Sequence, residues 1–426
     1  MNLADMLCYA DISELKKIAD TYDCVSTSHS KNELIQTILA TVQRRDVIES
    51  RIREISGNDL RFLNSLVFEN RTVYSLEELK ARALDKSAQP TQSAQTIQSI
   101  QSNPVHPTKP GTSGAPNPAT RRKPRSRKAK EEEQKPPPGP EENARLSISR
   151  FKSFGWLFNG VSQTTRSLFQ VPEDIKTRLC DVLEKRYKEN LIFTDEPLAY
   201  RDERSLLAED AVHFLRFVRN NTVPLTTEGV MYKRQISQAL EQLAVVESLP
   251  TRGGWRFGYG RHFRDYPDRF SLLYDFVYYE GLIAEQTEGG LTLTQAGFDV
   301  AAGLVKPDPA SLYRFWMRLY KSPIPNLAAL VQWIGRLSSQ WVTVDSLGET
   351  LQPLIRSYYY DTAADIFEQR ILRMLMHLGV LRWGETELGL QVVKATTQGR
   401  ALVSGHPLAF EDELPHGAGE NKLRSR

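Results

Sequence analysis

The side chains with the clearest chemistry are cations in one short run, Arg121-Arg-Lys-Pro-Arg-Ser-Arg-Lys-Ala-Lys130, followed at once by three glutamates. Cations at this density displace counterions from a phosphate backbone, and the resulting affinity depends on salt but not on base sequence. The alternative is a solvated tether whose opposite charges balance one another. The candidate DNA-binding residues of this run are Arg121, Arg122, Lys123, Arg125, Arg127, Lys128 and Lys130.

A second group of cations alternates with aromatic residues in a glycine-rich stretch. Arginines in such a loop can pair with phosphates while the rings stack on unpaired bases. The alternative is that the rings pack inward and the glycines permit turns, which the number of aromatics favours, because exposed aromatic clusters lower solubility. The candidate contacts are Arg252, Arg256, Arg261 and Arg264.

Motifs for catalysis are missing from the sequence. It contains no Gly-x-x-x-x-Gly-Lys-Ser/Thr phosphate loop, and Asp195-Glu196-Pro197 does not continue into the acidic box of a helicase. His213, His262 and His377 have no partner at metal-ligand spacing. We therefore expect no enzyme, no metal and no cofactor, and we expect His377 to be a hydrogen-bonded residue at the edge of a core.

Length and composition limit the class of protein. The chain has 426 residues, 40% of them hydrophobic, and a net charge of +3, so it can build two or three cores, and any nucleic-acid surface must be local. Its three cysteines are widely spaced, as expected of free thiols in a reducing compartment. No apolar stretch has the length of a membrane span, and the N-terminus does not resemble a signal peptide. We expect a soluble, cytoplasmic protein without a membrane partner.

A recurring phrase, Thr-x-x-Gly, indicates how the chain folds. It begins at Thr226, Thr294 and Thr396. Before the last two copies, a helical pattern ends at a glycine, and two short β-prone runs follow. Helix, glycine, hairpin and capped helix is the order at the end of a winged helix-turn-helix, although ordinary α+β packing produces the same order.

Changes in composition divide the chain. Residues 86–146 are rich in Pro, Ser and Gln and cannot bury enough apolar surface to fold, so they predict a disordered linker. We expect an N-terminal helical module over residues 1–85, a helical and winged-helix domain over 147–305, a second such domain over 306–405, and a flexible tail over 406–426. The expected class is mainly α, with some β structure.

The N-terminal pattern Leu15-Lys-Lys-Ile-Ala19, followed by Ser30-Lys-Asn-Glu-Leu-Ile35, resembles the small helical modules of the SAP and Rho N-terminal kind. That resemblance implies a DNA- or RNA-binding polar face. On this face the matching cations are Lys16, Lys17 and Lys31. Next, Ser75-Leu-Glu-Glu78 forms a capping box, which indicates a helix-turn-helix fragment, although an isolated helical hairpin would show the same pattern.

The run Pro224-Leu-Thr-Thr-Glu-Gly229, followed by Lys233-Arg234 and a hairpin closing on Thr294 to Gly297, is similar to the helicase-associated N-terminal domain of bacterial XPB-like proteins. That family accompanies superfamily 2 helicases or stands alone. The resemblance implies a role with DNA, contacts through Lys233 and Arg234, and a helicase or another DNA-processing protein as partner.

Together these patterns predict a non-catalytic DNA-binding or helicase-associated factor. One alternative is a protein–protein adaptor whose winged helices never touch nucleic acid. Another is a sequence-specific transcription regulator.

Overall fold

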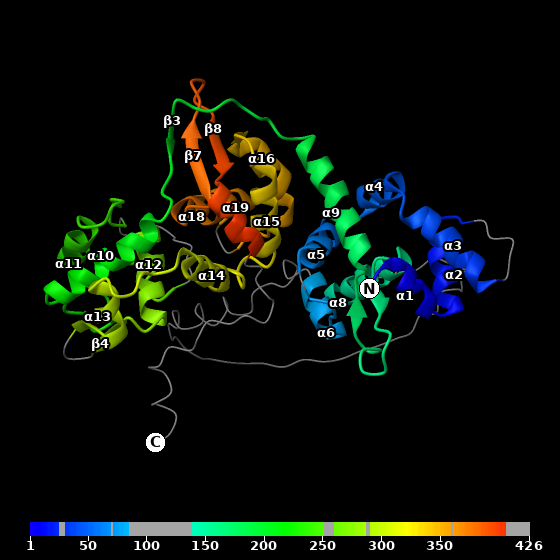
Figure 1. Cartoon of the computed structure of the whole chain (residues 1–426), viewed down its shortest axis with the longest axis horizontal. Coiled ribbons are helices and arrows are strands. Elements are labelled where there is room, and N and C mark those ends of the chain that lie inside the picture. The colour runs from blue at the N-terminus through cyan, green and yellow to red at the C-terminus, as the bar shows by residue number, and fades with distance from the viewer. Residues whose placement is uncertain are drawn as a thin grey trace, which may run out of the picture.

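The computed structural model describes residues 1–24, 30–69, 71–84, 139–250, 260–286, 290–358 and 361–405. The chain is mainly helical with short strands, as predicted. None of the helices within these ranges is both long and apolar enough to cross a membrane. Figure 1 shows an N-terminal helical body at one end of the long axis and two helix–hairpin units beyond it.

The N-terminal body is built from helices that follow one another closely, and three of them, α2, α5 and α6, begin at side-chain caps. Asp11 accepts the amide of Glu14 at the start of α2, and Ser75 accepts that of Glu78 at the start of α6. A short hairpin, β1 (Phe158–Asn159) with β2 (Phe169–Gln170), adds to it. The helices are α1 (Leu3–Tyr9), α2 (Ile12–Thr21), α3 (Lys31–Val42), α4 (Arg45–Glu54), α5 (Gly57–Val67), α6 (Leu76–Ala83), α8 (Pro140–Ser153) and α9 (Glu173–Lys188).

Helices on both sides of residues 85–138 form this one body. α6 packs on α8, and α4 and α5 pack on α9. The rings of Phe62 and Phe151 stack 5.0 Å apart, and the Tyr22 hydroxyl donates to the carbonyl of Phe154 at 2.8 Å. α8 begins at Pro140, earlier than the linker boundary predicted at residue 146, because proline suits the first position of a helix. The helices before residue 85 therefore share a core with α8 and α9.

The first helix–hairpin unit covers residues 206–301. Val223 bridges to Leu291 and so adds an extended residue beside the hairpin. The first helix, α10, packs on α12, α13 and β5. The elements are α10 (Leu206–Asn220), α11 (Lys233–Leu240), α12 (Asp268–Tyr279), β4 (Ile283–Gln286), β5 (Gly290–Leu293) and α13 (Gln295–Ala301).

The second helix–hairpin unit covers residues 327–405 and repeats this order after α14 (Pro309–Tyr320). Its third helix is continuous from Ala363 to His377, and its middle section, η3, has π-helical hydrogen bonding. Its sheet has the order β3-β7-β8-β6, in which β3 (Ala199–Arg201) comes from the segment after α9. The remaining elements are α15 (Leu327–Leu337), β6 (Val342–Thr343), α16 (Val344–Leu351), η2 (Gln352–Leu354), α17 (Ala363–Asp365), η3 (Ile366–Leu372), α18 (Arg373–His377), β7 (Leu381–Glu385), β8 (Gln391–Ala395) and α19 (Thr397–Gly405).

The Thr-x-x-Gly phrase closes both units in the same way. In the second unit, the Thr396 hydroxyl donates to the carbonyl of Gly379 at 2.9 Å and accepts the amide of Gly399 at 2.8 Å. Thr294 makes the same two bonds in the first unit, at 2.6 and 3.1 Å. Gly379 has φ +70°, the left-handed conformation that ends the preceding helix. One side chain therefore joins the end of the third helix to the start of the last.

The first copy of the phrase has a different structure. Thr226 accepts the amide of Val230 at 3.1 Å, and Gly229 turns the chain with φ +77°, so that Leu225 bridges to Met231. No helix starts at Thr226. The same letters therefore form a tight turn here and helix caps in the other two places.

Candidate nucleic-acid interface

Seven of the predicted DNA-binding residues lie within the described ranges, and they are dispersed over the molecule. Lys16 and Lys17 are exposed on α2, whereas Lys233 and Arg234 are exposed on the first turn of α11. Figure 1 shows α2 and α11 toward opposite ends of the molecule. These cations therefore do not form one patch. The predicted contacts outside the described residues are Arg121, Arg122, Lys123, Arg125, Arg127, Lys128, Lys130, Arg252 and Arg256.

Two of the placed cations are held by the protein itself. The ammonium of Lys31 donates to the carbonyl of Cys8 at 2.8 Å. The guanidinium of Arg261 lies 2.5 Å from Glu285 and 3.7 Å from the centre of the Tyr278 ring. Burial disfavours the charge on Glu285, but contacts with His262 and Arg261 outweigh it and hold the pKa of Glu285 below its ordinary value. Arg261 is thus paired with a carboxylate of the same chain.

Beside Arg261, a second carboxyl group is buried, and it forms no ion pair with any residue within the described ranges. Asp275 on α12 is 1% exposed, and its Oδ1 accepts the amide of Arg261 at 3.2 Å. Its Oδ2 has no hydrogen-bond partner among the described residues and lies against Gly260, where any side chain would overlap it. Burial raises the pKa of Asp275 to about 7. This carboxyl therefore changes charge near neutral pH.

The third helix of each unit is the one that a winged helix would present to DNA, and both are covered. Nine of the twelve residues of α12 are buried, from Arg269 to Val277. In η3 and α18, Ile366, Phe367, Ile371 and Leu375 are in the core. α12 packs against α10, α14 and β4. Most side chains of both helices are therefore occupied by the core, whereas base readout needs side chains that reach into a groove.

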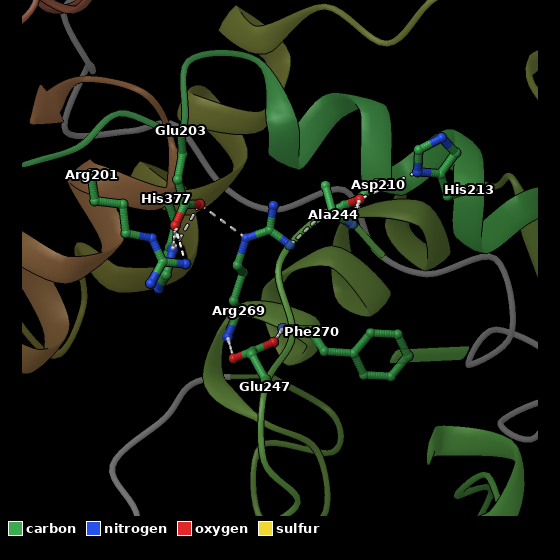
Figure 2. A network of polar contacts seen from close by, with 9 residues as sticks. All are labelled: Arg201, Glu203, Asp210, His213, Ala244, Glu247, Arg269, Phe270 and His377. Carbon is green, nitrogen blue, oxygen red and sulfur yellow. Dashed lines mark hydrogen bonds and ion pairs between the residues drawn. The ribbon is translucent and has the colours of Figure 1, made fainter. Parts of the chain in front are cut away.

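A buried ion network joins the two units (Figure 2). At its centre is Arg269 on α12, which is fully buried. Its Nε lies 3.2 Å from Glu203, in the segment before α10, and its Nη1 lies 2.6 Å from Asp210 on α10. Asp210 also accepts the amide of Ala244 at 2.7 Å. One guanidinium therefore neutralises two carboxylates that solvent does not reach.

Glu203 carries the network across to the second unit. Both of its oxygens lie 3.0 Å from Nδ1 of His377 on α18, and Arg201 lies 2.6 Å from Oε1. Burial opposes the charge on Glu203, but His377, Arg269 and Arg201 outweigh it, so the pKa of Glu203 is below its ordinary value. His377 is therefore hydrogen-bonded at the edge of a core, as expected. A parallel ion pair joins Arg370 on η3 to Asp268 at 3.1 Å.

Glu247 completes the network at the start of α12. Its two oxygens accept the amides of Arg269 and Phe270 at 2.9 and 2.8 Å, which places a carboxyl group at the positive end of the helix. Burial is the larger influence, however, and raises the pKa of Glu247 above its ordinary value. Figure 2 shows Glu247 and Glu203 on opposite sides of Arg269. We interpret the network as a structural connection between the two units, because its charged groups contact one another in the protein interior.

A search for metal-binding side chains and comparisons with known proteins add no further candidate site. Within the ranges that the structure describes, no group of His, Cys, Asp and Glu side chains is placed to hold a metal ion. No known protein family, curated protein or solved structure matches this chain.

The sequence did not reveal the network. Glu203, Arg269 and His377 are separated by 66 and 108 positions in the chain. An arginine such as Arg269 at the start of an apolar helix is usually a solvated residue. The one available signal was a histidine within an apolar helix, which predicted a hydrogen bond but not its partner.

Proposed function

We propose that this protein is a non-catalytic DNA-binding factor that holds phosphates through the basic run 121–130 and uses two winged-helix units as a rigid scaffold. The observation that carries the proposal is the segregation of charge. Seven of the ten residues from Arg121 to Lys130 are cations. By contrast, the cations of the described ranges are scattered, and several are ion-paired.

The order of elements supports the winged-helix interpretation. Each unit has a helix, an extended residue or strand, two more helices and then a hairpin. In both units the early extended segment pairs with the second strand of the hairpin, Val223 with Leu291 and Val342 with Val393. This connectivity is the one expected of a winged helix-turn-helix, and it supports the proposal.

The burial of the third helices favours a factor without sequence-specific readout. Base readout requires side chains that reach base edges in a groove, and α12 keeps its side chains in the core. Phosphate contacts position a protein on DNA without specifying sequence. We therefore expect salt-dependent binding with little sequence preference. The association with a superfamily 2 helicase is proposed on the sequence resemblance alone.

The test is fluorescence anisotropy of the full-length protein with labelled duplex and single-stranded DNA over a range of salt. If all seven cations engage phosphates, the logarithm of the duplex binding constant falls with the logarithm of salt at a slope of roughly −6. Replacing the seven by glutamine should weaken binding equally on different sequences and flatten the slope. The matched control replaces Lys86, Lys109 and Lys135, three cations of the same segment outside the run. Unchanged affinity after the sevenfold replacement contradicts the proposal.

A protein–protein adaptor is the second candidate, and one observation favours it. Three large apolar side chains near the end of the first unit are exposed: Phe298 (48%), Leu304 (76%) and Val305 (54%). Exposed apolar residues grouped in this way are typical of protein interfaces. Tight binding to a protein partner that is insensitive to salt, together with no DNA binding at low salt, would support the adaptor.

A further inference from the structure

The sheet β3-β7-β8-β6 has one face in the core, and its other face is only partly covered. Leu381, Val393 and Val342 point into the core of the second unit. Because side chains alternate along a strand, the register places a different set on the outer face. Tyr200 pairs with Gly384, two residues from Arg382, and Arg382 pairs with Lys394. This second face therefore carries Tyr200, Arg382, Lys394 and Trp341, beside Val392 and Thr343, which are buried.

These four side chains contact one another in a row. The rings of Tyr200 and Trp341 lie 5.3 Å apart. The guanidinium of Arg382 is 5.4 Å from the centre of the Tyr200 ring, and the ammonium of Lys394 is 5.8 Å from that of Trp341. Two aromatic rings are thus flanked by two cations on a flat strand surface.

The row rests on Trp341, is exposed to solvent at Tyr200, and has half-buried cations at its two ends. Asp202 accepts from Nε of Arg382 at 2.9 Å, which fixes the guanidinium beside the tyrosine ring. Trp341 is 3% exposed and supports Tyr200, whose residue is 41% exposed. The indole N–H of Trp341 has no hydrogen-bond partner within the described ranges. An exposed ring on a rigid base, with cations at its edges, is suited to a planar ligand that carries negative charge.

We propose that this outer face, defined by Tyr200, Arg382, Lys394 and Trp341, binds single-stranded nucleic acid. A base would stack on Tyr200 while Arg382 and Lys394 contact the phosphates on either side. Stacking requires a base whose face is free, so the site would prefer single strands to duplex. This inference rests on the proposed function and adds to it the form of nucleic acid that is bound.

The test measures, by fluorescence anisotropy, the binding of full-length Tyr200→Leu and of the parent to a labelled 15-nucleotide oligothymidine and to a duplex of equal length. Leucine covers Trp341 but offers no ring. We expect single-strand affinity to fall roughly tenfold and duplex affinity to change little. Tyr200→Phe should restore binding, because the ring is retained. Lys394→Gln should reduce the single-strand salt slope by about 0.7, the contribution of one phosphate contact.

The control is Tyr232→Leu, which removes another exposed tyrosine (50%) at the start of α11, far from the sheet. Equal thermal unfolding midpoints will show that each variant is folded. Photocross-linking with an oligonucleotide that contains 4-thiothymidine should attach at or beside Tyr200. Equal single-strand affinity of Tyr200→Leu and the parent overturns the inference and leaves this face to a protein partner. If loss of the basic run alone abolishes all binding, the proposed function stands and the sheet-face site fails. No binding by the parent overturns both.

Discussion

Asp275 makes the stability of the protein depend on pH, and Asp275→Asn should remove that dependence. Burial raises the pKa of Asp275 from 3.8 to about 7 in the folded chain. In the unfolded chain, the carboxyl ionises near 3.8. Between these two values the folded state binds more protons than the unfolded state, so stability falls as pH rises. The contribution is fully present below pH 3.8 and is lost as pH passes through 7.

The magnitude follows from the two pKa values. A difference of one between the folded and unfolded pKa corresponds to about 1.4 kcal/mol, so the ionised carboxyl costs about 4 kcal/mol of folding free energy above about pH 8. Between about pH 5 and pH 8 the loss is about 2.5 kcal/mol, because part of it has already occurred at the lower pH. Asparagine keeps an oxygen for the amide of Arg261 but never ionises. The variant should therefore gain on the parent by about 2.5 kcal/mol over this range.

The assay is urea-induced unfolding of parent and variant at pH 5, 6, 7 and 8, with the free energies compared at each pH. The matched control is Asp265→Asn, which alters an exposed carboxylate on the neighbouring loop. Its difference from the parent should be small at every pH. A parent–variant difference for Asp275→Asn that does not change with pH refutes the reasoning, because it would mean that the carboxyl is not buried as described.

Three further predictions concern contacts that hold the fold together, and each is measured by chemical denaturation. Arg269→Met should cost about 3–5 kcal/mol, because it leaves buried Asp210 without its arginine and removes one of the cations that surround Glu203; Arg314→Met, which breaks an exposed pair at 3.9 Å, should cost less than about 1 kcal/mol, and equal costs would contradict the network. Thr396→Val should cost about 1–2 kcal/mol, because the helix cap is lost. Thr396→Ser keeps the hydroxyl and should retain most of the stability of the parent; equal losses for Val and Ser would contradict the role of the hydroxyl. Gly297→Ala should cost about 1–3 kcal/mol, because its Cβ would overlap the carbonyl of Leu282, whereas Gly405→Ala has open space and should be tolerated; similar effects at both glycines would show that the close approach is wrong.

Local signals in the sequence located most elements of the two units. The two β-prone runs predicted before Thr294 form β4 and β5, and the glycine predicted to end the preceding helix is Gly281, which has φ +66°. Such features depend on a few adjacent residues, which the sequence displays directly. The Thr226 copy shows the limit of this approach. Its letters match the helix caps, but the chain around it determines that it forms a turn.

Long-range contacts were not predictable in this way. Nothing near Arg269 indicates that it meets Glu203 and Asp210, and nothing in Tyr200 indicates that it joins a sheet whose other strands begin more than a hundred residues later. Both contacts depend on how distant elements pack. Arginine and tyrosine also occur commonly on protein surfaces, so the residue type alone does not predict the contact. The candidate interface was therefore predicted only from runs of cations and from short local resemblances.

The packing of α6 against α8 determines the order in which this protein can be assembled. The 54 residues between Leu84 and Gly139 leave and re-enter the same body, so they are an insertion rather than a bridge between domains. During synthesis, the first 84 residues emerge without α8 and α9, which complete their core. That body can close only when about a hundred further residues have left the ribosome. For the same reason, a single cut within the insertion would leave two polypeptides whose shared core holds them together.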